Sequence, residues 1–468
     1  MNSVDYGVLA PAWAGTNAAA TASDVAFVQA MLDVEAAWVN VQAEVGLCTC
    51  EDAQAVAQIA KVSRYDLASL AAKTPDGANA LIPLLSMMRA LLVEDGASPT
   101  AGTALHRGAT SQDIIDSALM LVVSRTLEST LADLRQTARG LASLAQEHRE
   151  TVCIARSLTQ HALPTTFGWK AASWLSAVLS AEAGLQQAEQ HLALQWGGAV
   201  GTLASLEQLL AKHPEVKTTS AELSSKLAGA LGLKDVGTPW HTNRMPILQI
   251  GSALASTVAA LGTFGADVLT ASRPEIAELS EPLEAGKGGS SAMPHKQNPV
   301  RSLLLRNAAI SAPGLAATLF SAAGTAVDER PDGGWHSEWQ ALRELLRLAS
   351  GAAHHGAVLA RGLEVNESSM QRNLRLSGDA IMSERVTSVA AGLVSGGKAA
   401  IQALVRRSLT DQVSLGELLR LEIPSTELSD KELSELLDPA GYLGAADRFT
   451  TTVLAEYSAR KELWQSHS

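Results

Sequence analysis

One segment of the sequence, from Thr110 to about residue 148, sets the scale of the whole fold. Its apolar residues recur in alternating steps of four and three, at Leu127, Leu131, Leu134, Ala138 and Leu141. That spacing is typical of an amphipathic helix, and a helix of this extent would be roughly 55 Å long. A small domain cannot cover so long an apolar stripe. The segment therefore predicts a helical bundle, of the kind that is often shared between subunits.

Four more segments have the length and apolar spacing of long helices, and with the first they predict a five-helix bundle: residues 164–195, 242–278, 299–323 and 335–363. Pro164 and Pro299 stand where a first helical turn would begin, a position that tolerates proline. Hydrophobic residues make up 47% of the chain and aromatic residues only 4%, which favours Ala- and Leu-rich helices over sheets. We therefore predict an all-α fold with three helical domains: residues 1–110, a central bundle at 111–363, and residues 364–468.

Charge and composition exclude several classes of function. The formal net charge is −12, and no basic run offsets it, which argues against nucleic-acid binding. The three cysteines cannot all pair and lack a zinc-like spacing, and the first residues lack the features of a secretory signal. We therefore expect a reduced, cytoplasmic protein without a metal site. The uncharged stretch at 245–266 is long enough to span a bilayer, but its polar residues and flanks favour a buried bundle helix rather than a membrane span.

Four segments rich in polar residues interrupt the helical pattern, each at a predicted helix end. Helix starts carry free N–H groups and the positive end of the helix dipole, so such segments can converge on one anion. The first is "HRGATSQD", which begins at His106. Its Thr110 and Asp113 fit a capping box at a helix start, whereas Thr110 and Ser111 also have hydroxyls that suit a carboxylate ligand.

The second segment is "RSLTQHALPTTFGWK", and the third is "GTPWHTNRMP". In the second, Thr165 and Thr166 are placed to bind a carboxylate at a helix start, beside Gln160 and His161. A single histidine is more often structural than catalytic, so His161 is a candidate only through these neighbours. In the third, Arg244 either anchors the end of the following helix or forms a bidentate clamp on a substrate carboxylate.

The fourth segment, residues 285–299 with the sequence "AGKGGSSAMPHKQNP", is the most specific. Its glycines and prolines exclude a helix interior. Two adjacent serines, Ser290 and Ser291, precede Lys296 and Asn298 at the next predicted helix start. A serine hydroxyl is a poor base and becomes usable only in a water-excluded, cationic setting. The segment therefore predicts an anion site that carries its own base.

This loop resembles the signature GSSxMPxKxNP of the fumarase/aspartase superfamily, and "GATSQD", "PTTFG" and "GGAVGT" occur in that family's order over nearly the whole chain. The resemblance implies an all-α subunit, a homotetramer with a twenty-helix core, active sites shared between subunits, and no cofactor. It implies that Ser290 is the base that removes a proton alpha to a carboxylate, with Lys296 and Asn298 stabilising the resulting charge. Thr110, Ser111, Thr165 and Thr166 match the family's substrate-binding segments.

Adenylosuccinate lyases of this superfamily carry a catalytic His–Glu pair, and the matching positions here are Leu158 and Leu303. An intramolecular lactonisation releases no amine and needs no such proton donor. The chain accordingly resembles the 3-carboxy-cis,cis-muconate cycloisomerases, which convert their substrate to 4-carboxymuconolactone in the protocatechuate branch (beta-ketoadipate pathway) of aromatic catabolism. That reading makes Ser290 or His161 the proton-transfer group, with the tricarboxylate held by a set of polar residues: His106, Thr110, Ser111, Gln160, Thr165, Thr166, Arg244, Ser291, Lys296, Asn298, Arg330 and His336.

Two alternatives remain open. Gln297 stands where many relatives have a basic residue, which indicates a less charged substrate. The chain would then be a succinyl-type lyase, adenylosuccinate lyase-like or acting on a small nitrogen-bearing substrate, that releases fumarate. A catalytically silent helical scaffold is the third reading, but the intact set of Ser290, Lys296 and Asn298 argues against it.

Overall fold

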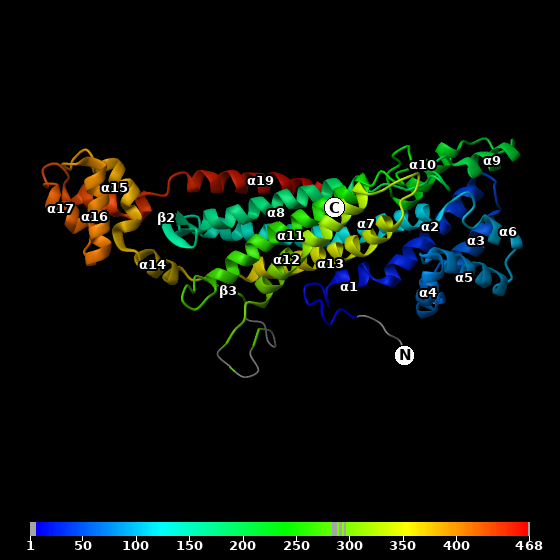
Figure 1. The fold of residues 1–468 in the computed structure, drawn as a ribbon, viewed down its shortest axis with the longest axis horizontal. Helices are drawn as coiled ribbons and strands as arrows, with labels where there is room; N and C mark the ends of the chain where they lie inside the picture. The colour runs from blue at the N-terminus through cyan, green and yellow to red at the C-terminus, as the bar shows by residue number, and fades with distance from the viewer. Residues whose placement is uncertain (1–5, 283–287, 290–292, 294–295, 467–468) are drawn as a thin grey trace. The chain divides into compact units, whose positions relative to one another are not determined.

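The computed structural model describes residues 6–282, 288–289, 293 and 296–466. Within these residues the chain forms nineteen α-helices and two small two-stranded sheets (Figure 1). The predicted all-α fold is thus confirmed. The two sheets are short antiparallel pairs: β1 (Val152–Ser157) with β2 (Gln160–Thr166), and β3 (Leu279–Ser280) with β4 (Glu364–Val365).

The five predicted long helices are all present: α7 (Ser111–Glu147), α8 (Phe167–Glu189), α11 (Met245–Ala271), α12 (Val300–Gly324) and α13 (Gly333–Gly362). Two predicted starts are wrong by three residues: Pro164 lies in strand β2 and α8 begins only at Phe167, and α11 begins at Met245 instead of residue 242. Residues Val152 and Ile154 pair across the ladder with Thr166 and Pro164. This pairing gives the backbone its hydrogen-bond partners, so Thr165 and Thr166 lie in a strand rather than in a first helical turn.

The chain forms two compact units. Unit 1 comprises Met1–Leu134, Ala181–Gly262 and Leu304–His355, and unit 2 comprises Arg135–Ser180, Thr263–Leu303 and Gly356–Ser468. Each of the five long helices contributes residues to both units. The division into three domains at residues 110 and 363 remains a prediction.

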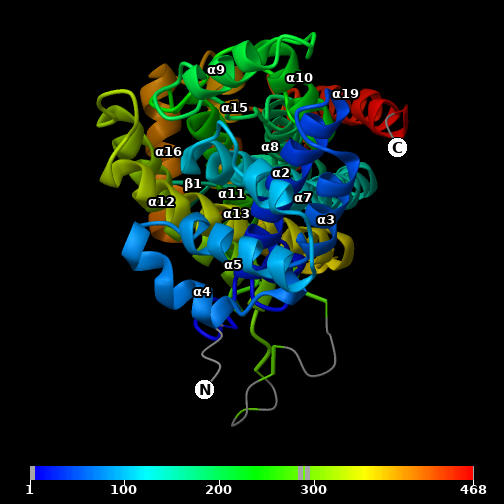
Figure 2. The same ribbon diagram turned by 90° about the vertical axis from the view of Figure 1, so that its right-hand side faces the viewer.

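In unit 1, the N-terminal helices pack on one another beside α2, as Figure 2 shows for α3 and α5. Their starts follow local capping chemistry: Ser23 caps α2, and Thr49 and Asp52 form a complete capping box at α3. The shorter helices of this unit are α1 (Asn17–Thr21), α2 (Asp24–Glu44), α3 (Cys50–Ile59), α4 (Leu67–Lys73), α5 (Leu81–Glu94), α6 (Pro99–Ala104), α9 (Ala204–Lys212) and α10 (Ser220–Leu231).

In unit 2, the C-terminal helices enclose an apolar core that includes Ile154, Met382, Ile401 and Leu419. Helices α15, α16 and α17 form a cluster that is orange in Figure 1. The elements of this part are α14 (Glu367–Arg375), the 3-10 helix Gly378–Met382, α15 (Ser383–Ala390), α16 (Gly397–Asp411), α17 (Leu415–Glu422), α18 (Asp430–Leu437) and α19 (Ala446–Ser466).

Helices α11 and α12 are each long and apolar enough to cross a membrane, a property that core helices of bundles share. The small residues of α11 bring its neighbour close: a Cβ added to Gly262 would lie 2.3 Å from the Cβ of Ala309 on α12. Such close approach is the expected use of glycine between packed helices. In the single chain only 28% of the apolar window of α12 is buried, and Ile310 and Phe320 are exposed.

Candidate active site

The start of helix α7 brings two predicted substrate ligands together in unit 1. The backbone N–H of Thr110 donates to the Asp113 carboxylate at 3.0 Å, which is one half of the predicted capping box. The backbone N–H of Asp113 donates to the carbonyl oxygen of Thr110 at 3.0 Å, and the Thr110 hydroxyl accepts a hydrogen bond from Nη1 of Arg330 at 2.8 Å. Arg330 Nε also lies 3.4 Å from the side-chain oxygen of Gln112. A guanidinium and a hydroxyl therefore meet at this helix start.

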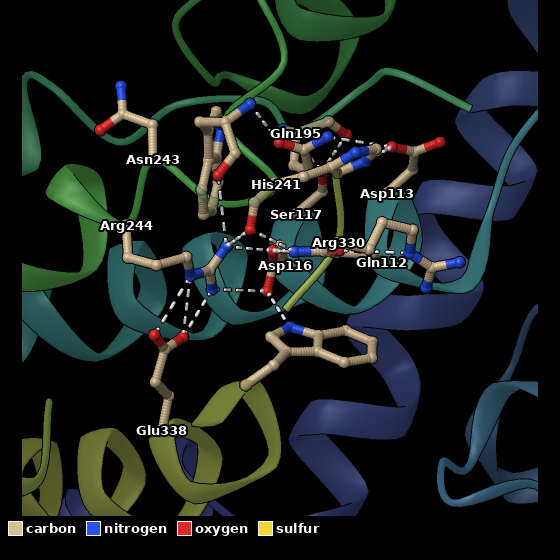
Figure 3. A network of polar contacts seen from close by, with 12 residues as sticks. Gln112, Asp113, Asp116, Ser117, Gln195, His241, Asn243, Arg244, Arg330 and Glu338 are labelled. Carbon is tan, nitrogen blue, oxygen red and sulfur yellow. Dashed lines mark hydrogen bonds and ion pairs between the residues drawn. The ribbon is translucent and has the colours of Figure 1, made fainter. Parts of the chain in front are cut away.

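The Asp113 carboxylate organises the loop around this position (Figure 3). It is fully buried and accepts from five donors: the backbone N–H groups of Thr110, Gly197 and Gly198 at 2.9–3.0 Å, Nε2 of Gln195 at 3.0 Å, and Nε2 of His241 at 3.2 Å. Charge-assisted hydrogen bonds are about twice as strong as neutral ones. Asp113 thus holds the "GGAVGT" segment against α7.

Gly198 shows why that loop needs a glycine. Its φ is +69°, and an added Cβ would lie 3.1 Å from the carbonyl oxygen of Gly108. A side chain here would meet both backbone strain and a close contact.

Arg244 is paired with acidic residues of its own unit, which fits the first of its two predicted roles, anchoring the following helix, better than the carboxylate clamp. Its side chain is fully buried between two acidic residues of unit 1 (Figure 3). Nη1 and Nη2 donate to Asp116 at 2.7 and 3.1 Å, while Nε and Nη2 donate to Glu338 at 3.0 and 2.6 Å. Burial by itself lowers the pKa of Arg244, but the two carboxylates outweigh it and raise that pKa. Trp335 also donates its indole N–H to Asp116 at 2.9 Å.

The remaining candidate residues of unit 1 are His106, His336 and Ser111, and both histidines contact other residues of the same unit. Nδ1 of His106 lies 2.8 Å from the buried Glu35 carboxylate, so α2 fixes this ring. Nδ1 of His336 lies 3.2 Å from the carbonyl oxygen of Asp332, and the ring packs beside Trp335 and Trp339. Ser111 is the half-buried first residue of α7.

In unit 2, the β1–β2 hairpin carries the second group of candidates. Gln160 is exposed beside the turn at Leu158 and Thr159, and Thr165 pairs with Cys153 across the ladder. The Thr166 hydroxyl accepts from the backbone N–H of Trp169 at 3.1 Å, and so it caps the start of α8.

His161 is half-buried, and its Nδ1 lies 3.0 Å from the hydroxyl of Ser377. Burial, and then the positive charge of Arg156, lower the pKa of His161, whereas Glu278 opposes this effect. The ring is thus biased toward its neutral form, in which one nitrogen carries a proton and the other accepts one.

The signature loop is described only in part, and Ser290 and Ser291 lie outside the described residues. Lys296 and Gln297 are exposed. Asn298 donates twice to the carbonyl oxygen of Gly288, from its side chain at 3.1 Å and its backbone at 2.9 Å. Lys296 is the described cation nearest in sequence to the predicted base.

The start of α12, beside this loop, already holds a carboxylate of the chain itself. Glu281 accepts from the backbone N–H of Arg301 at 3.0 Å and of Ser302 at 2.7 Å, and from the Ser302 hydroxyl at 2.6 Å. At α7, the Asp113 carboxylate accepts from the backbone N–H of Thr110, the residue just before the helix. An internal carboxylate therefore occupies N–H groups of the first turn at α12, where the sequence predicted free N–H groups.

The structure thus separates the candidates into two local groups. Unit 1 places Thr110 with Arg330, and unit 2 places His161 with Ser377. The contacts of Glu281 and Ser377 were not predicted, and Asp113 was predicted only as a cap. Glu281 could have been noticed as an acidic residue a few positions before the signature loop, whereas no local pattern marks Ser377. In the part of the chain that the structure describes, no group of three His, Cys, Asp or Glu side chains is arranged to hold a metal ion.

Comparison with known proteins defines the class of protein to which this chain belongs. Residues 7–314 match the family model described as "Lyase". The chain belongs to this family, and it is an enzyme of the fumarase/aspartase superfamily.

Its relatives carry out more than one reaction. The chain is 43% identical to a nitrosuccinate lyase of Streptomyces davaonensis, over 95% of this chain and 93% of that protein. It is 38% identical to a 3-carboxy-cis,cis-muconate cycloisomerase of Pseudomonas aeruginosa, over 93% of each chain. Among solved structures, the 3-carboxy-cis,cis-muconate lactonizing enzyme from Pseudomonas putida superposes with a TM-score of 0.85 at 34% identity, covering 95% of this chain and 97% of that one. The family is therefore established, and the comparisons leave the particular reaction open.

Proposed function

We propose that this enzyme is a lyase that eliminates a stable anion from a small 2-substituted succinate and releases fumarate, with nitrosuccinate as the leading substrate. The observation that carries this proposal is the burial of Arg244 between Asp116 and Glu338. It removes one of the three cations predicted to bind substrate and leaves Arg330 and Lys296. Two cations match a dicarboxylate better than a tricarboxylate, because a buried charge needs a partner.

The residues at the two positions of the lyase His–Glu pair support the same choice. The positions of the lyase His–Glu pair hold Leu158 and Leu303, whose exposed fractions are 94% and 53%. An amine leaving group needs a proton from such a pair. Nitrite does not, because nitrous acid is acidic enough that nitrite leaves as the anion at neutral pH. The uncharged Gln297 and the 43% identity to a nitrosuccinate lyase agree with this assignment.

The proposed reaction uses the chain's own residues. Ser290 removes a proton from C3 of the succinate, and the charge spreads into the adjacent carboxylate, where Lys296 and Asn298 stabilise it. The C2–nitrogen bond then breaks with its electron pair going to nitrite, while the C2–C3 double bond of fumarate forms. The second carboxylate is held by Arg330 and the Thr110 hydroxyl of a partner subunit, because active sites of this superfamily are shared between subunits. Within each chain, Nη1 of Arg330 and the Thr110 hydroxyl lie 2.8 Å apart. The products are fumarate, nitrite and one proton.

The predicted cycloisomerase is the second candidate. Its support is the 38% identity to the Pseudomonas aeruginosa enzyme and the TM-score of 0.85 to the Pseudomonas putida structure. Lactonisation also needs no donor to a leaving group, so Leu158 and Leu303 are compatible with it. It requires a site for three carboxylates, however, and the buried Arg244 weakens that site.

A substrate comparison tests the proposal. Purified enzyme is incubated separately with nitrosuccinate and with 3-carboxy-cis,cis-muconate, and fumarate, nitrite and lactone are quantified. We expect fumarate and nitrite in equal amounts, with Ser290→Ala as the inactive control. Lactone formation from carboxymuconate without nitrite release from nitrosuccinate would assign the enzyme to the cycloisomerases instead.

We also propose that four copies assemble through the long helices. The poorly covered apolar window of α12 and its exposed Ile310 and Phe320 support this arrangement, because contiguous apolar surface marks an interface. Light scattering coupled to gel filtration should give four times the chain mass of 48.8 kDa. A monomeric mass would contradict the assembly.

A further inference from the structure

The partner of His161 is a residue that neither the motifs nor the proposed mechanism uses. Ser377 lies between α14 and the 3-10 helix Gly378–Met382, more than two hundred positions after His161 in the sequence. Its hydroxyl lies 3.0 Å from Nδ1 of His161. Among the residues that the structure describes, no other side chain hydrogen-bonds to this imidazole.

A buried polar cluster fixes the position of Ser377 relative to the hairpin. Glu278 is 4% exposed and binds both terminal nitrogens of Arg156, at 2.7 and 2.9 Å. Arg156 is the cross-strand partner of His161 in the β1–β2 ladder. Asn373, in the last turn of α14, donates to Glu278 at 2.7 Å and to the carbonyl oxygen of Ile276 at 2.8 Å.

A second contact joins the same elements. The side chain of Gln371 on α14 donates to the carbonyl oxygen of Val152 on β1 at 3.2 Å. The helix that leads into Ser377 and the hairpin that carries His161 are therefore tied by an ion pair and several hydrogen bonds. The two charged members of this buried network are paired with each other, which favours one geometry, while Oδ1 of Asn373 has no hydrogen-bond partner among the described residues.

A hydroxyl partner has a specific consequence for a proton-transferring histidine. It can donate to Nδ1 when Nε2 carries the proton, and it can accept from an Nδ1–H when the ring is charged. The contact thus survives both protonation states, whereas a carboxylate in the same place would favour the charged ring. Among the described residues, the charged groups that act on His161 are Arg156 and Glu278, which form the ion pair described above.

We infer that Ser377 is a positioning residue for His161: its hydroxyl fixes the imidazole through Nδ1 and leaves Nε2 on the opposite side of the ring for proton transfer with substrate or water. The part of His161 in the reaction rests on the proposed elimination, in which it passes the released proton to water. The geometry of the ring does not, and it can be tested without any substrate.

The test compares Ser377→Ala with Ser377→Thr, which keeps a hydroxyl, and with Ser408→Ala as a matched control. Ser408 lies on α16 of the same unit and donates only to the carbonyl oxygen of Val413. Solid-state ¹⁵N spectra of histidine-labelled protein report the tautomer of His161, and the spectrum of His161→Gln identifies its signals. Initial rates on nitrosuccinate across a pH series give kcat and KM for each variant.

In Ser377→Ala we expect the His161 ¹⁵N signals to move toward a mixture of tautomers, and kcat to fall about three- to tenfold, the effect of one lost neutral hydrogen bond. The pH profile of kcat should shift while KM stays nearly constant. Ser377→Thr should restore both readouts, and Ser408→Ala should change neither. Unchanged His161 signals and an unchanged pH profile in Ser377→Ala would overturn the inference. If the wild-type enzyme does not act on nitrosuccinate, the proposed function fails, but the ¹⁵N comparison still decides the role of Ser377.

Discussion

Replacing Arg244 by methionine tests the buried ion cluster at the centre of unit 1. Methionine keeps much of the side-chain length but removes every donor. The Asp116 and Glu338 carboxylates, which are 0% and 1% exposed as side chains, would then face each other without a counter-charge. Removing one partner of a buried ion pair typically costs about 3–5 kcal/mol. Because two carboxylates lose their partner, we expect a loss at the upper end of that range.

The stability lost in Arg244→Met should depend on pH in a definite direction. Burial raises the pKa of Glu338, and Asp116 adds to this effect, while Arg244 opposes it. Without Arg244 the folded-state pKa rises further above the unfolded value of about 4.3. Above the folded-state pKa of Glu338, the Arg244→Met variant therefore loses the full electrostatic part of its free energy of unfolding. This loss disappears as the pH falls below the unfolded-state pKa of Glu338. The stability difference from wild type should shrink on acidification.

The assay is urea unfolding followed by circular dichroism at several pH values, together with steady-state kinetics of the folded fraction. Arg244→Met combined with Asp116→Asn and Glu338→Gln should recover part of the lost stability, because no charge is then left unpaired. A stable Arg244→Met enzyme with a raised KM and unchanged unfolding would refute this reasoning. That result would make Arg244 a substrate clamp after all.

Three further substitutions follow from the site. Ser290→Ala should reduce kcat by several orders of magnitude without changing the melting temperature or the assembly, and wild-type rates in this variant would remove Ser290 from the mechanism. Asp113→Asn should destabilise the enzyme by at least about 2 kcal/mol. Both carboxylate oxygens of Asp113 accept hydrogen bonds, so the amide NH₂ of asparagine would face an N–H donor in either orientation. An unchanged melting curve would contradict this. Glu281→Ala should cost about 1 kcal/mol through loss of the cap on α12, seen as faster amide exchange in the first turn of α12 but not of α13.

Much of the fold was readable from local patterns. The apolar rhythm from Leu127 to Leu141 predicted α7, and the structure places that helix at Ser111–Glu147, within one residue of the expected start and end. The error at Pro164 has a physical cause. Proline is compatible both with a first helical turn and with an edge strand, and only the pairing of residues 152–157 with 160–166 selects the strand.

The candidate site was predictable in its residue types but not in its contacts. The motifs marked Thr110, His161 and Arg244, yet their partners come from distant parts of the chain. Arg330 meets Thr110 across 220 positions, and Glu338 meets Arg244 across 94. Nothing near Arg244 in the sequence indicates that its guanidinium N–H groups will be hydrogen-bonded to two carboxylates.

By itself, the sequence determined the helices, the superfamily and the chemical groups available for removing a proton next to a carboxylate, because helix periodicity, capping and motif chemistry act over a few neighbouring residues. Only the tertiary structure decided which of these groups remain free to meet a substrate. A charged side chain is available or committed according to what packs against it, and that depends on segments that the fold brings together from far apart in the chain.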